Sequence, residues 1–164
     1  MRSAQATVVG FTGHQSLSRS TRDLVRVALK EELTQLAPVV GVTSLAAGSD
    51  QIFADCVLEL RGELTVVVPS EGYEESFASP DDLSDYHRLL RLASRRTVLD
   101  HDRPSEAAYW DAGRKIVDQA DVVLAVWDGR RAAGLGGTGD VVRYASDRGR
   151  QVIVVWPAGA CRAS

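Results

Sequence analysis

Glycines, hydroxyl groups and acidic residues gather in three short segments of this sequence. The candidate site residues in them are Gly10, Thr12, Gly13 and His14; Gly48, Ser49 and Asp50; and Asp128, Gly129, Gly136, Gly137, Thr138, Gly139 and Asp140. Clustered glycines let backbone N–H groups approach an anion with no Cβ in the way. A helix that begins just after such glycines adds the attraction of its N-terminal amides and dipole. These residue types and spacings favour binding of a phosphate group.

Strand-like and helix-like segments alternate about six times along the chain and must position these residues. Apolar runs rich in Val and Ile predict strands at 6–11, 40–46, 64–69, 97–99, 121–127 and 151–156. Continuous apolar strands, in place of alternating ones, are typical of strands that are covered on both faces. We therefore predict an α/β fold in which one open parallel sheet has helices on both sides, in a single domain over residues 1–164.

Each of the three segments follows a predicted strand. Ligands of open parallel sheets bind beyond the carboxyl ends of the strands, near the point where the strand order reverses. We therefore expect the three segments to meet at one edge of the sheet.

Structural alternatives stay open for several of the candidates. His14 can contact a ligand or cap backbone groups in its own loop. Asp50 can cap the helix that follows it or accept hydrogen bonds from ribose hydroxyls. Arg114, whose guanidinium suits a phosphate, can face the cleft or the solvent. The glycines at 136–139 can also form an ordinary surface loop.

Composition and charge argue against several classes of protein. The 164 residues carry a net charge of −3, so there is no general basic field, and we expect no nucleic acid as a partner. No apolar stretch reaches the roughly 18 residues of a membrane span, and the first residues have no apolar signal core. We expect a cytoplasmic protein without a membrane partner. Cys56 and Cys161 have no CxxC partner and the histidines lie far apart, so no disulfide, metal or resident cofactor is expected.

Four segments resemble the SLOG superfamily of Rossmann-like nucleotide-binding domains, most of all its YpsA-like branch: GFTGH at 10–14, SLAAGSDQIFAD at 44–55, GRKIVDQADVVLAVWDG at 113–129 and GGTGDVVRYA at 136–145. The superfamily also includes the lysine-decarboxylase-like (LOG) phosphoribohydrolases and the DprA fold. The resemblance implies a Rossmann-like three-layer sheet, a nucleotide or nucleotide-derived ligand at the three segments, and a homodimer or higher homo-oligomer.

The resemblance leaves catalysis open. In the LOG enzymes, the arginine of an RK pair and the glutamate of PGGxGTxxE serve cleavage of the N-glycosidic bond of nucleoside monophosphates. Arg114 and Lys115 match the RK pair, but the place of the glutamate falls on Arg143. A carboxylate stabilises the positive charge that develops on the ribose, whereas an arginine opposes it. We therefore expect a sensor or carrier that binds a nucleotide-like ligand without converting it.

Two other functions stay open. One is a LOG-type hydrolase of nucleotide N-glycosidic bonds that uses a displaced carboxylate. Its candidate residues are Arg114, Asp128 and Asp140, with Glu71 as a further carboxylate. The other is an oligomerising structural module with a vestigial pocket.

Overall fold

A computed structural model describes residues 5–131, 135 and 137–163. Their strands form one parallel sheet in the order β4-β3-β2-β1-β5-β6. The strands are β1 (Thr7–Gly13), β2 (Val39–Thr43), β3 (Glu63–Val68), β4 (Arg95–Val98), β5 (Val122–Val126) and β6 (Gln151–Val155). The central strand β1 pairs with both β2 and β5, so the strand order reverses between β1 and β5. The predicted α/β class with one open parallel sheet is confirmed.

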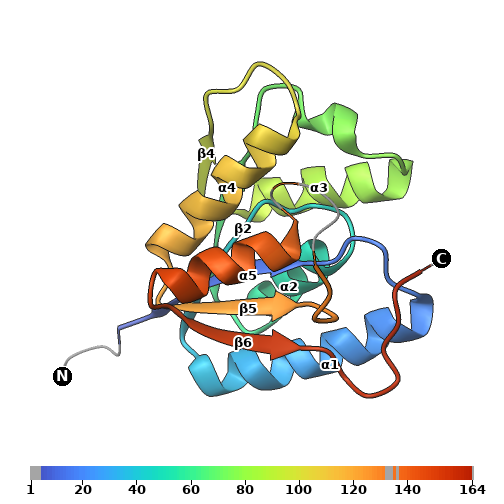
Figure 1. Ribbon diagram of the computed structural model, residues 1–164, viewed down its shortest axis with the longest axis vertical. Coiled ribbons are helices and arrows are strands. Elements are labelled where there is room, and N and C mark those ends of the chain that lie inside the picture. Colours follow the sequence, from blue (N-terminus) through green and yellow to red (C-terminus); the bar gives the residue numbers. More distant parts are fainter. Residues whose placement is uncertain (1–4, 132–134, 136, 164) are drawn as a thin grey trace.

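Helices cover both faces of the sheet. They are α1 (Arg19–Leu36), α2 (Ser49–Glu59), α3 (Pro80–Leu92), α4 (Glu106–Gln119) and α5 (Thr138–Asp147), with a short 3-10 helix, η1 (Tyr73–Ser76). In Figure 1, α4 and α5 lie in front of the strands and α2 lies behind them. Packing places α1 beside α2 on that second face, and α3 next to α2. Within the described residues, no helix is both long enough and apolar enough to cross a bilayer.

The core explains why the strands read as continuous apolar runs. All residues of β5 are buried. Leu124 and Val126 belong to the cluster that contains Val25 and Leu29 of α1. Val123, directly before Leu124, packs with α4 and α5 on the opposite face. A strand with an apolar layer on either side needs an apolar residue at every position.

Serine side chains fix where several helices begin. The hydroxyl oxygens of Ser18, Ser79 and Ser105 accept hydrogen bonds from backbone N–H groups in the first turns of α1, α3 and α4. Each hydroxyl satisfies an amide that has no partner inside its helix.

Candidate functional site

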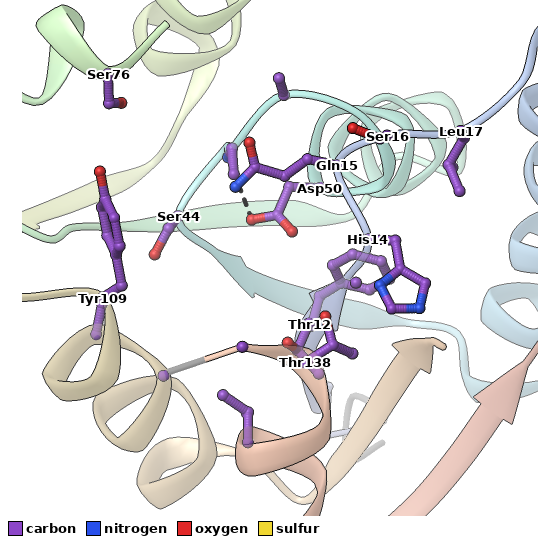
Figure 2. A pocket seen from close by; sticks show the side chains of 18 of the residues that line it. Thr12, His14, Gln15, Ser16, Leu17, Ser44, Asp50, Ser76, Tyr109 and Thr138 are labelled. Atoms are coloured by element: carbon purple, nitrogen blue, oxygen red, sulfur yellow. Dashed lines mark hydrogen bonds between the residues drawn. The ribbon is translucent and has the colours of Figure 1, made fainter. Parts of the chain in front are cut away.

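The carboxyl ends of β1, β2 and β5 open into a cavity of about 840 Å³. It lies where the strand order reverses, the position expected for ligands of parallel sheets. Its wall comes from the loops that follow these three strands, the start of α5, the region around η1 and the C-terminal segment. Figure 2 shows Thr12 and Thr138 close together below Asp50, with Tyr109 and Ser76 on the far side of the opening.

The cavity brings together part of the predicted site. The predicted residues that line it are Thr12, Gly13, His14, Asp50, Gly137, Thr138 and Gly139. Those that do not line it are Gly10, Gly48, Ser49, Arg114, Asp128, Gly129 and Asp140, and Gly136 lies outside the described residues. The three segments therefore meet as expected, and their role in binding stays a prediction.

Two of the residues outside the cavity hold its loops together. The backbone N–H and the hydroxyl of Ser49 both donate to the carbonyl oxygen of His14, at 3.2 and 2.7 Å. Gly48 lies against Gln15, where an added Cβ would overlap the carbonyl oxygen. The β1–α1 and β2–α2 loops are thus joined by backbone contact, which fixes the cavity wall in advance of any ligand.

His14 lines the cavity and bonds to a backbone group of the loop after β5, whereas contact with a ligand stays a prediction. Its ring lines the cavity, and its Nε2 accepts a hydrogen bond from the backbone N–H of Asp128 at 3.1 Å. Burial, reinforced by the charge of Arg162, lowers the pKa of His14, although the Asp128 carboxylate 3.2 Å away opposes this shift. A neutral ring that accepts at Nε2 carries its proton on Nδ1.

Asp50 is a buried carboxyl group in the wall of the cavity. It is 7% exposed, and its Oδ2 accepts from the Thr43 hydroxyl at 2.9 Å and from the Ala46 N–H at 3.2 Å. Burial raises the pKa of Asp50 to about 7, despite these hydrogen bonds, which lower it. The N-cap of α2 is Gly48, and Asp50 is the second residue of the helix. Asp50 therefore does not cap α2. At neutral pH the group can donate or accept a hydrogen bond.

Arg114 lies away from the cavity. It is paired with Asp111 on the same helix, and its guanidinium carbon lies 5.5 Å from the centroid of the Trp110 ring. Asp111 also contacts His101 at 2.7 Å. His101, Asp111 and Arg114 border a separate depression of about 360 Å³, formed by α4 and the segment after β4. The match to the RK pair therefore concerns sequence position and does not place this arginine at the cavity.

Several lining residues escaped the sequence analysis. They are the arginines Arg22, Arg130, Arg131 and Arg162, together with Tyr109 of α4. The pair at 130–131 directly follows Asp128 and Gly129, so its place after β5 was a usable signal. No pattern in the sequence links Arg162 to the site. Among the described residues, no group of His, Cys, Asp and Glu side chains could hold a metal ion.

An open parallel sheet with a polar cavity at its reversal point defines a Rossmann-like α/β protein. No family model and no curated protein matches the sequence. Solved structures do match the fold. DNA processing protein A from Helicobacter pylori matches with a TM-score of 0.68 and 14% identity, over 95% of this chain and 68% of that one. Its Streptococcus pneumoniae counterpart gives 0.67 and 17%, over 94% and 52%.

A cofactor-binding protein has the same fold. The molybdenum cofactor binding protein of Rippkaea orientalis matches with a TM-score of 0.58 and 18% identity, over 93% of this chain and 77% of that one. The Rossmann-like fold expected from the SLOG resemblance is therefore confirmed, whereas the YpsA-like branch stays a prediction. This chain spans about half the length of the S. pneumoniae protein, and its single-domain organisation also stays a prediction.

The exclusion of nucleic acid as a partner is wrong. The H. pylori structure describes a single-stranded DNA binding mode of a protein with this fold. The exclusion assumed that the arginines are scattered, but folding gathers four of them at the rim of one cavity. A net negative charge on the whole chain says little about the local field there.

Proposed function

We propose that this chain binds a nucleotide or nucleotide-derived ligand through its phosphate and acts as a sensor or carrier. The observation that carries the proposal is the 840 Å³ cavity into which the first residues of α5 open. Gly137 precedes that helix, and Thr138 and Gly139 form its first turn. Backbone amides at a helix N-terminus, a threonine hydroxyl and surrounding guanidinium groups are the donors that a phosphate accepts from.

The remainder of the cavity suits the less charged part of such a ligand. Tyr109 and Phe77 provide aromatic surface, and Ser44, Ser76 and Ser79 provide hydroxyl groups. Ligand pockets commonly combine an apolar lining with a few polar groups that fix orientation. The molybdenum cofactor binding protein of R. orientalis and the molybdenum cofactor carrier of Chlamydomonas share the fold, which supports a carrier role. The cytoplasmic location and the homo-oligomer remain predictions from the sequence.

Ligand binding is tested by thermal unfolding in the presence of a panel of nucleotides. A ligand at about 100 times its Kd stabilises the folded chain by about 2.7 kcal/mol. For a chain of this size the expected rise in Tm is about 5–10 °C. We expect Thr138→Val to weaken binding by about tenfold, because it removes one donor to a charged group. Thr97→Val, on the exposed edge strand β4, is the matched control. No rise in Tm with any nucleotide would count against the proposal.

A LOG-type hydrolase is the second candidate, and Asp50 is the observation that favours it. The carboxylates first considered for this role, Asp128, Asp140 and Glu71, do not line the cavity, whereas Asp50 does. Its pKa of about 7 is the value that suits a general acid or base at neutral pH. Incubation with nucleoside monophosphates separates the two functions. Release of free base that is lost in Asp50→Asn would favour the hydrolase over the carrier.

A further inference from the structure

Four arginines from three separate parts of the chain surround the cavity. They are Arg22 of α1, Arg130 and Arg131 of the loop after β5, and Arg162 of the C-terminal segment. Within the described part of the chain, the first three form no ion pair. Guanidinium groups that lie close together without acidic partners repel one another, and binding of an anionic ligand reduces that repulsion. The charge at this rim thus opposes the net charge of −3 of the whole chain.

The C-terminal segment is fixed against the start of α1 by backbone pairing. Leu17 and Arg162 form an antiparallel bridge, and the Ala163 N–H donates to the carbonyl oxygen of Ser16 at 3.1 Å. The Cys161 N–H donates to the Thr21 hydroxyl at 2.8 Å. This pairing carries Arg162 to the same rim as Arg22, although 139 positions separate them in the sequence. The segment is therefore part of the cavity wall.

Acidic side chains near the cavity neutralise only part of the positive charge of the four arginines. The Asp128 carboxylate interacts with two of the arginines. Its Oδ1 accepts from the backbone N–H of Arg130 at 2.9 Å, and its Oδ2 lies 3.9 Å from Nη1 of Arg162. Among the described residues, the carboxyl groups that line the cavity are those of Asp50 and Asp82. Asp50 is buried and has a pKa near 7, so it is partly neutral at physiological pH. The lining therefore keeps an excess of positive charge.

We propose that the cavity holds two phosphoryl groups of one ligand, and that the ligand class is a nucleotide with a diphosphate group. The inference rests on the proposed function, which assigns the first phosphoryl group to the start of α5. The amides and hydroxyl there suffice for the terminal oxygens of one phosphate. Arg22 and Arg162 come from other segments and provide planar five-donor groups that bind a second phosphate bidentately.

The test compares ADP with AMP on the full chain by isothermal titration calorimetry. We expect ADP to bind at least about tenfold more tightly than AMP, because hydrogen bonds to charged groups are among the strongest. Arg22→Ala and Arg162→Ala should each lower ADP affinity by about tenfold and change AMP affinity by less than about twofold. Arg95→Ala is the matched control, because Arg95 is exposed on β4 and does not line the cavity. Thermal unfolding without ligand verifies that the variants are folded.

Each outcome of this comparison has a definite meaning. Equal affinity for ADP and AMP, or equal losses for both ligands in the arginine variants, overturns the diphosphate inference and leaves the proposed function standing. Failure of both nucleotides to bind overturns the diphosphate inference, and the proposed function falls as well if no nucleotide of the thermal-unfolding panel binds. Inorganic pyrophosphate that binds as tightly as ADP supports the two-phosphate site and identifies the diphosphate group as sufficient. A short oligothymidylate that binds more tightly than ADP, with the same arginine dependence, overturns the inference in favour of single-stranded DNA.

Discussion

Replacing Gly48 with alanine is expected to lower the free energy of unfolding by about 3 kcal/mol or more. Two independent effects add at this position. Gly48 has a φ of +84° and a ψ of −127°, a backbone conformation that residues with a Cβ rarely adopt. An added Cβ would also overlap the carbonyl oxygen of Gln15, which is backbone and cannot rotate away. The loops that follow β1 and β2 would have to separate, and the cavity wall would change with them.

The matched control is Gly149→Ala. Gly149 has a φ of +72°, but no atom lies within 4 Å of the position of an added Cβ. It therefore carries the cost of a positive φ without the overlap, and we expect a loss of about 1 kcal/mol. Urea unfolding followed by circular dichroism measures both variants. Equal losses would show that the contact between Gly48 and Gln15 adds nothing, and that the two loops move apart without cost.

Much of the fold could be predicted because burial on both faces leaves a signature in the sequence. Val122–Val126 is apolar throughout, since each face of β5 packs against helices. The edge strand β4 lacks this signature. Its residues are all exposed and it begins with Arg95 and Arg96, whereas the apolar pattern predicted a strand only from residue 97. An edge strand is fixed by backbone pairing with β3, for which side-chain polarity is no guide.

The location of the site could be predicted from the sequence, but which residues line the cavity and which support its loops could not. Parallel topology alone brings the ends of β1, β2 and β5 to one edge, so the three glycine-containing segments had to meet. Whether a residue lines the cavity or supports it depends on distances of a few ångströms. Ser49 and His14 lie in two of those segments, yet Ser49 bonds to the His14 backbone while the His14 ring lines the cavity. Residue type cannot distinguish these roles.

The arginines were missed for a different reason. Arg162 reaches the cavity through backbone pairing between the C-terminal segment and the residues before α1. Backbone pairs form between most residue types, so they leave little trace in a single sequence. A charge count over the chain also hides the result, because it averages the rim of the cavity with acidic surfaces elsewhere. The positive charge around the cavity can be recognised only once the fold shows which segments lie beside one another.

The stability of the chain is expected to depend on pH through Asp50. Its pKa rises from an ordinary value of 3.8 to about 7 on folding, chiefly because burial disfavours the charged form. The folded chain therefore holds one more proton than the unfolded chain between about pH 4 and 7, and the contribution of Asp50 to stability falls as the pH rises through this window. From pH 5 to pH 8 the loss is about 2–3 kcal/mol.

Asp50→Asn isolates this contribution from that of other titrating groups. An asparagine Oδ1 can accept from both the Thr43 hydroxyl and the Ala46 N–H, as Asp50 Oδ2 does, but it carries no charge at either pH. Groups such as His14, Asp111 and Asp128, whose pKa values are lowered, act in the opposite direction and are present in both proteins. We expect the stability of wild type minus that of Asp50→Asn to be about 2–3 kcal/mol smaller at pH 8 than at pH 5. Urea unfolding at the two pH values measures it. A constant difference would mean that Asp50 keeps its charge in the folded chain, and its part as a neutral donor in the cavity would then have to be abandoned.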